Sequence, residues 1–171
     1  MKKLILIRHA KSDWGNIHQK DFDRSLNARG LRDAPFMAHI LKEYVSQIDK
    51  IISSPANRAN TTCNFFADEF EYPKTNIEFD RGIYEDGQKT ILSILGQLDN
   101  SINTVVLFGH NPDITATATF LAGERIDNIP TCGIISINFD FDDWTKVTKV
   151  NGKKEFFLFP KLYFKDAELD W

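Results

Sequence analysis

Four side chains with the chemistry of phosphate binding and transfer stand at three separate places in the sequence. Arg8 and His9 follow a short apolar run, Arg58 lies in SSPANRANTT, and His110 lies in LFGHNP. Guanidinium groups present planar sets of donors that match phosphate oxygens, and a neutral imidazole can attack phosphorus and carry the phosphoryl group covalently. Each residue alone is compatible with a structural role. Together they predict an anion site that contains a candidate nucleophile.

The elements expected before these residues explain how they could meet. The apolar runs at 3–7, 50–53 and 104–108 each predict a short buried strand, and each run ends in polar residues. In a parallel sheet covered by helices, functional groups gather at the carboxyl ends of the strands. The three polar strand ends are therefore expected at one edge of one sheet.

The remaining periodicity completes an alternating pattern of strands and helices. Apolar residues at steps of three and four predict helices, with Asn27 as the N-cap of the first. Further strands are expected late in the chain, and DRGIYEDGQ is expected to be a loop. The polar terminal segment FKDAELDW carries Trp171, which could fold back onto the surface. The predicted helices are 27–46, 56–70, 90–98 and 113–121, and the further strands are 76–79, 133–139 and 154–159. Alternation of this kind predicts an α/β fold with helices on both faces of a mainly parallel sheet.

Composition bounds the class of protein. With 171 residues, of which 42% are hydrophobic, the chain is long enough for one well-covered core, so one domain over 1–171 is expected. A net charge of −3 without a basic stripe argues against nucleic acid as a partner. No run approaches the length of a membrane span or a signal-peptide core, which makes the cytoplasm the expected location. Cys63 and Cys132 lack metal-ligand spacing and are expected to be buried as small apolar residues.

The segments LIRHA, SSPANRANTT and LFGHNP resemble the three signatures of the histidine phosphatase superfamily, in the family's order and at similar intervals. The RHA variant and the short chain resemble the SixA-type branch, the phosphohistidine phosphatases, more than the longer phosphoglycerate mutases. The resemblance implies a three-layer α/β/α sandwich of the phosphoglycerate mutase type, with no metal ion and no cofactor. It also implies that His9 is the residue that becomes phosphorylated, that Arg8 and Arg58 bind the phosphoryl oxygens, and that His110 is the second histidine of the site.

Glu85, in IYED, is the candidate proton donor, on a loop where many members of the superfamily place an acid. The role needs a carboxyl pKa raised by burial or by a neighbour such as Asp86. The alternative is a solvated surface pair of acids. When phosphohistidine is the substrate, the leaving group is an imidazole, which needs protonation by an acid less than an alkoxide leaving group does.

Four further residues are candidates for binding the substrate. DFDRSLNARG matches a SixA-like pattern, and its Arg24 could receive an anionic substrate or could simply pair with Asp21 or Asp23. Ser12 follows the nucleophile by three residues and could bond a phosphoryl oxygen. The other two candidates are Asn111, just before the helix at 113–121, and Thr131 in IPTCG.

These observations favour a metal-independent phosphatase that works through a phosphohistidine intermediate on His9. The phosphorylated partner is expected to be a protein, such as a histidine phosphotransfer domain, or a small metabolite. A small-molecule phosphomonoesterase or a mutase would use the same site, although a mutase needs a pocket closed to water. A phosphate-binding domain without catalysis is the alternative from another class.

Overall fold

Strand β1 (Lys2–Arg8) lies inside a six-stranded mixed sheet with the order β3-β2-β4-β1-β5-β6. In this computed structural model, residues 1–164 are described, so the prediction for Trp171 falls outside them. β1 pairs in parallel with β4 (Thr104–Gly109) and antiparallel with β5 (Ile134–Phe139). Strands β2 (Lys50–Ser53) and β3 (Glu78–Phe79) continue the parallel half. The antiparallel edge is β6 (Lys153–Leu158).

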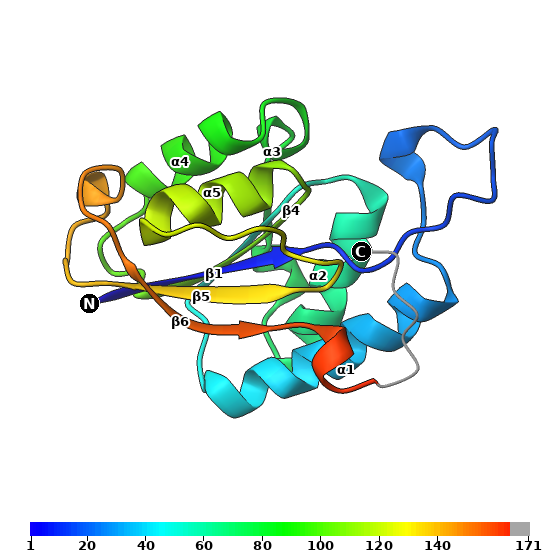
Figure 1. Ribbon diagram of the computed structural model, residues 1–171, viewed down its shortest axis with the longest axis horizontal. Helices are drawn as coiled ribbons and strands as arrows, with labels where there is room; N and C mark the ends of the chain where they lie inside the picture. The colour runs from blue at the N-terminus through cyan, green and yellow to red at the C-terminus, as the bar shows by residue number, and fades with distance from the viewer. Residues whose placement is uncertain (165–171) are drawn as a thin grey trace.

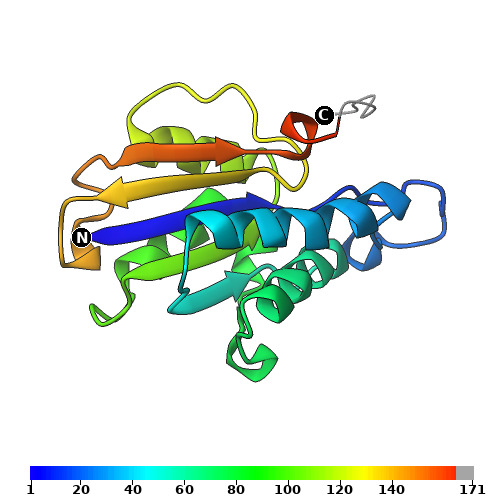
Figure 2. The same cartoon turned by 90° about the horizontal axis from the view of Figure 1, so that it is seen from below.

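Helices cover both faces of this sheet, as Figures 1 and 2 show from two directions. Helices α1 (Ala28–Tyr44) and α2 (Asn57–Glu69) pack together on one face. Helices α4 (Gln88–Gly96) and α5 (Asp113–Ala122) lie on the other. The expected three-layer α/β/α architecture of the phosphoglycerate mutase type is thus confirmed. None of the described helices is long and apolar enough to cross a bilayer.

Strand β1 alternates its side chains between two cores, which fixes it rigidly in the sheet. Ile5 and Ile7 pack in the core shared with α1 and α2, whereas Leu4 and Leu6 pack in the core shared with α4 and α5. All four are completely buried. A one-residue slip of β1 would exchange the side chains between the two cores, so the register that presents the residues after Ile7 is strongly specified.

Local sequence explains the start of α1. Asn27 caps the helix by accepting a hydrogen bond from the Gly30 backbone N–H at 2.9 Å, as its position predicts. Gly30 is required because a Cβ there would lie 2.1 Å from the backbone oxygen of Lys11. The helix therefore begins in direct contact with the segment that follows β1.

The structure differs from the sequence-based expectation between β3 and α4. Residues 80–88 were expected to be a loop, but they contain the short helix α3 (Gly82–Glu85). The Asp80 side chain accepts a hydrogen bond from the Gly82 N–H at 2.8 Å, an Asx-turn contact that favours a turn at the start of this helix. The described part of the chain also contains short 3₁₀ helices, which are η1 (Asp21–Asp23), η2 (Lys74–Asn76), η3 (Trp144–Lys146) and η4 (Pro160–Leu162).

Candidate active site

The carboxyl ends of β1, β2 and β4 meet at one edge of the sheet. Arg8 pairs with Gly109 in the parallel register, and Ser53 pairs with Phe108. The polar residues that follow each strand therefore enter one region, as the sequence predicts.

A pocket of about 290 Å³ opens at this edge, and we call it the His9 pocket. Eight of the nine predicted site residues line it, and the ninth, Glu85, does not. The pocket also contains three residues that were not predicted to be part of the site. Its lining consists of Arg8, His9, Lys11, Ser12, Trp14, Asp21, Arg24, Arg58, His110, Asn111 and Thr131.

His9 is held by backbone contacts in one orientation. Its Nδ1 lies 2.8 Å from the carbonyl oxygen of Ala10, which can only accept, so Nδ1 carries the proton and Nε2 keeps its lone pair. The N–H of Ala10 in turn donates to the Thr62 hydroxyl at 3.0 Å. Burial has the largest effect, followed by the repulsion that would arise if His110 were protonated as well and by the charges of Arg58 and Arg8; together they lower the pKa of His9 well below its usual value of 6.5. A neutral imidazole with a free Nε2 is the form that can act as a nucleophile.

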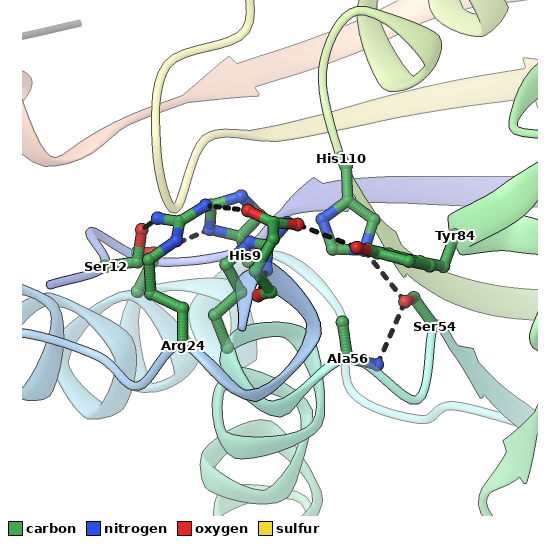
Figure 3. Close-up of polar contacts among 10 residues, drawn as sticks. His9, Ser12, Arg24, Ser54, Ala56, Tyr84 and His110 are labelled. Atoms are coloured by element: carbon green, nitrogen blue, oxygen red, sulfur yellow. Dashed lines mark hydrogen bonds and ion pairs between the residues drawn. The ribbon is translucent and has the colours of Figure 1, made fainter. Parts of the chain in front are cut away.

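His110 is neutral for the same reasons. Its ring lies 5.2 Å from that of His9, centroid to centroid. Burial, with the charge of Arg58 next in importance, lowers the pKa of His110 to about 3. Two neutral imidazoles thus stand side by side among arginines, as Figure 3 shows for the histidines.

Three arginines supply the positive charge of the His9 pocket. Arg58 and Arg24 are almost completely buried at their side chains, and Arg8 is half-buried, with its Nη1 held 3.1 Å from the carbonyl oxygen of Ile129. Burial and the proximity of Arg58 lower the pKa of Arg8. Buried guanidinium groups with a common pocket create an anion site with strong, geometrically defined donors.

Asp21 is one of the three pocket residues that the sequence reasoning missed, since it was considered only as a surface partner of Arg24. Its carboxylate accepts from Arg24 Nη2 at 3.0 Å, from Arg58 Nη2 at 3.1 Å and from the Tyr84 hydroxyl at 2.8 Å. Burial alone would raise the pKa of Asp21, but hydrogen bonds from Tyr84 and Arg24 and the charge of Arg58 outweigh it and lower the pKa to about 2. The sequence did contain a signal for Asp21, because this residue is the first position of the SixA-like D-x-x-R pattern that ends at Arg24. Arg24 pairs with Asp21, as one of the two alternatives predicts, and it also lines the pocket, so its contact with an anionic substrate stays a prediction.

Three of the candidates for binding the substrate, Ser12, Asn111 and Thr131, line the pocket and also make contacts with neighbouring segments. The Ser12 hydroxyl accepts a hydrogen bond from Arg24, and Thr131 accepts one from Arg29 at 3.4 Å. Asn111 uses its amide to donate to the carbonyl oxygen of Ile129 at 3.0 Å. These contacts hold the loops around the arginines.

Glu85 lies outside the His9 pocket. Its carboxylate is exposed and pairs with Arg81 Nε at 2.7 Å, an i,i+4 contact along α3. The neighbouring Tyr84, on the same short helix, is the residue that reaches the site, through Asp21. Glu85 is thus an exposed residue that does not line the pocket, and its role as a proton donor stays a prediction.

The buried state of Cys63 and Cys132 is confirmed, with both thiols free. Over residues 1–164, no group of three histidine, cysteine or acidic side chains is arranged to hold a metal ion.

Comparison with known proteins decides the family. A model of the histidine phosphatase superfamily (branch 1) matches residues 4–92, which is more than half of the chain. The chain belongs to this superfamily. The match includes Arg8, His9 and Arg58 and ends before His110.

Individual relatives agree with this assignment. The crystal structure of the phosphohistidine phosphatase SixA, described as putative, from Agrobacterium tumefaciens superposes with a TM-score of 0.80 at 27% identity, covering 93% of this chain and 98% of that one. An uncharacterised chloroplastic protein of Arabidopsis thaliana is 28% identical over 159 residues, 88% of this chain and 72% of its own length. Phosphoserine phosphatase 1 of Hydrogenobacter thermophilus is 36% identical over 90 residues, 49% of this chain and 42% of its own. This histidine phosphatase is thus a phosphatase of the SixA-type branch.

Proposed function

We propose that this phosphatase removes the phosphoryl group from phosphohistidine on a protein, through a covalent intermediate on His9 and without a metal ion. The observation that carries the proposal is the state of His9: a buried, neutral imidazole whose Nδ1–H is held by Ala10 and whose Nε2 is free. A binding module has no need for such a prepared nucleophile.

The proposed reaction has two balanced steps. First, His9 Nε2 attacks phosphorus as the P–N bond of the substrate breaks. A substrate phosphohistidine that is protonated on its other ring nitrogen leaves as neutral imidazole, so no acid from the enzyme is needed. Second, water attacks phosphorus, the bond to His9 breaks, and inorganic phosphate leaves. Arg8, Arg24 and Arg58 neutralise the oxygens that carry charge in both transition states.

A protein substrate is supported by the surroundings of the pocket. Trp14 lines it with 70% of its surface exposed, and Ile17 on the same segment is 87% exposed. A hollow of about 810 Å³ with mainly apolar walls runs beside α5, is lined by the half-exposed Phe120, and shares Asn111 with the His9 pocket. Exposed apolar side chains that border a charged pocket are typical of a surface that meets another protein. A histidine phosphotransfer domain, in the cytoplasm, fits this surface.

A small phosphomonoester is the second candidate, because the phosphoserine phosphatase of Hydrogenobacter thermophilus is 36% identical over 90 residues, which is 49% of this chain. In that case the apolar surroundings of the pocket would be irrelevant to turnover. A mutase or a phosphate-binding domain would differ from both in releasing no inorganic phosphate.

The test is turnover of an aryl phosphate and of a phosphorylated histidine phosphotransfer domain, both with a chelator present. We expect inorganic phosphate from both, a labelled enzyme that is acid-labile and base-stable, and a higher kcat/KM for the protein. The variant His9→Asn should form no label and lose at least about 10³-fold in rate. A folded wild-type protein that neither turns over nor labels would refute the proposal, and inhibition by the chelator would refute the metal-free step.

Faster turnover of small phosphomonoesters than of the phosphorylated protein would instead favour the second candidate. The variant Ile17→Ala separates these outcomes further. It should raise KM for the protein and leave KM for the aryl phosphate nearly unchanged, because this exposed side chain does not line the His9 pocket and offers contact area to a large partner only.

A further inference from the structure

The hydroxyl of Ser54 holds the second histidine of the site. Ser54 follows directly after β2 and is completely buried. Its Oγ lies 2.8 Å from Nε2 of His110 and also accepts a hydrogen bond from the Ala56 N–H at 3.2 Å. Figure 3 shows both contacts converging on the serine oxygen.

Counting donors assigns the proton between Ser54 and His110. A serine hydroxyl carries one hydrogen, and Ala56 N–H already acts as a donor to its oxygen. Within residues 1–164, Nε2 of His110 is the one acceptor that the structure gives this hydrogen. If Nε2 carried a proton instead, the Ser54 hydrogen and the lone pair of the buried Nδ1 would both lack partners, whereas the first arrangement leaves only the Nδ1–H without one among the described residues. One additional unsatisfied buried group costs about 1–3 kcal/mol. The hydroxyl therefore donates to Nε2.

The other nitrogen of His110 then carries the proton. Nδ1 is buried and has no hydrogen-bond partner among the described residues. In Figure 3 it is the ring nitrogen of His110 that faces His9. A donor without a partner is thus directed to the side of the site where the phosphoryl group of the intermediate would be carried.

We propose that Ser54 is a positioning residue that fixes His110 as the Nδ1–H tautomer, so that a neutral histidine donates a hydrogen bond to the phosphoryl group. The proposal rests on the proposed function, because it assumes that this group is transferred to His9. With the opposite tautomer, the lone pair of Nδ1 would face a phosphoryl oxygen and repel it.

The two histidines are then set in complementary ways by neighbours of opposite character. The Ala10 carbonyl accepts from His9 Nδ1 and frees Nε2 for attack, whereas the Ser54 hydroxyl donates to His110 Nε2 and makes Nδ1 a donor. Because both imidazoles are neutral, the tautomer, and not the charge, decides which of them attacks and which stabilises.

The tautomer can be measured directly by ¹⁵N NMR of histidine-labelled protein, without any substrate. We expect His110 in the wild type to show a protonated Nδ1 and a bare Nε2. Ser54→Ala should shift His110 toward the Nε2–H form or a mixture, and Ser54→Thr, which keeps the hydroxyl, should restore the wild-type pattern. Ser53→Ala is the matched control, because it removes the adjacent buried hydroxyl, which donates to the Ser54 carbonyl oxygen at 2.9 Å and does not touch His110.

Kinetics then show whether the tautomer matters. Ser54→Ala should lower kcat for an aryl phosphate about tenfold with a smaller change in KM, while Ser53→Ala should stay within about twofold of the wild type. In a His110→Ala background, Ser54→Ala should add no further loss, whereas a purely structural serine would lower the rate in both backgrounds.

Two results would overturn the proposal: a wild-type His110 with its proton on Nε2, or an unchanged tautomer and rate in Ser54→Ala. Both results can be obtained without detecting the phosphoenzyme. Labelling of His9, which tests the proposed function, is a separate measurement. A correct tautomer without labelling of His9 would contradict the catalytic consequence and the proposed function, and would leave only the structural assignment of the proton.

Discussion

The carboxylate of Asp21 accepts a hydrogen bond from Nη2 of Arg58 at 3.1 Å, and the Asp21 backbone oxygen accepts one from Nη1 of the same guanidinium group at 2.7 Å. Arg24 binds the other carboxylate oxygen. A carboxylate thus occupies donors that a phosphoryl group needs. Binding of a phosphate is consequently an exchange of one anion for another.

This exchange predicts that Asp21→Asn binds inorganic phosphate or tungstate about fivefold more tightly than the wild type. The anion no longer has to displace a carboxylate, and breaking a partly exposed ion pair costs on the order of 1 kcal/mol. Isothermal titration calorimetry measures the difference. Asp23→Asn is the control, because it removes the same charge two residues away. Equal affinities in the two variants would show that Asp21 does not compete with the ligand.

Glu85→Gln is expected to leave kcat on aryl and alkyl phosphates within about twofold, because its carboxylate pairs with Arg81 outside the His9 pocket. General acid catalysis typically contributes about 10²–10⁴-fold, so a proton donor would be evident. A tenfold loss confined to alkyl phosphates would support the catalytic role predicted for Glu85.

Tyr84, the neighbour of Glu85 on α3, does reach the site. The variant Tyr84→Phe removes a hydrogen bond to Asp21 and should raise the pKa of that carboxyl.

The sequence predicts the parts of the site that strands deliver. Arg8, His9 and His110 follow apolar, β-branched runs that predict buried strands. Because the carboxyl ends of parallel strands share one edge of the sheet, these residues are expected to meet there, as they do. The same edge is predicted for Arg58, because this residue lies in the first turn of the helix that comes shortly after such a strand. The order of strands in the sheet, including the antiparallel β5, comes from pairing between distant segments, on which local periodicity is silent.

Asp21 and Glu85 show where the sequence gives little guidance about which residues line the site. Both are acidic residues outside regular strands, and their local sequence gives no preference for one over the other. The segment from 11 to 26 has no periodicity, and it is held by the bridge between Ser12 and Leu26 and by the contacts of Arg24. The contacts of Ser12 with Arg24 and Leu26, and that of Asp21 with Arg58, join residues far apart in the sequence, so the position of Asp21 could be known only from the folded chain.

The lowered pKa values of His9 and His110 predict a definite pH dependence of stability. Their pKa values in the folded state lie below the unfolded value of about 6.5, so the unfolded chain binds more protons as the pH falls below that value. The free energy of unfolding should therefore decrease from pH 6.5 toward pH 4. Urea unfolding at a series of pH values measures this slope, and His110→Gln should reduce it. A slope unchanged in the variant would mean that His110 ionises normally in the folded state.

Gly30 predicts how tightly the segment after β1 is held by α1. A Cβ at this position would lie 2.1 Å from the backbone oxygen of Lys11, which belongs to the His9 pocket and cannot move as a side-chain end would. Gly30→Ala should lower the free energy of unfolding by about 1–3 kcal/mol, the usual cost of overpacking. Gly96→Ala is the matched control at the end of α4, since a Cβ there meets no atom within 4 Å, and it should stabilise by about 0.4–1 kcal/mol. Both values come from urea unfolding of the purified variants. If Gly30→Ala were as stable as Gly96→Ala, the start of α1 could shift away from Lys11 without cost, and the contact would not be what fixes the edge of the pocket.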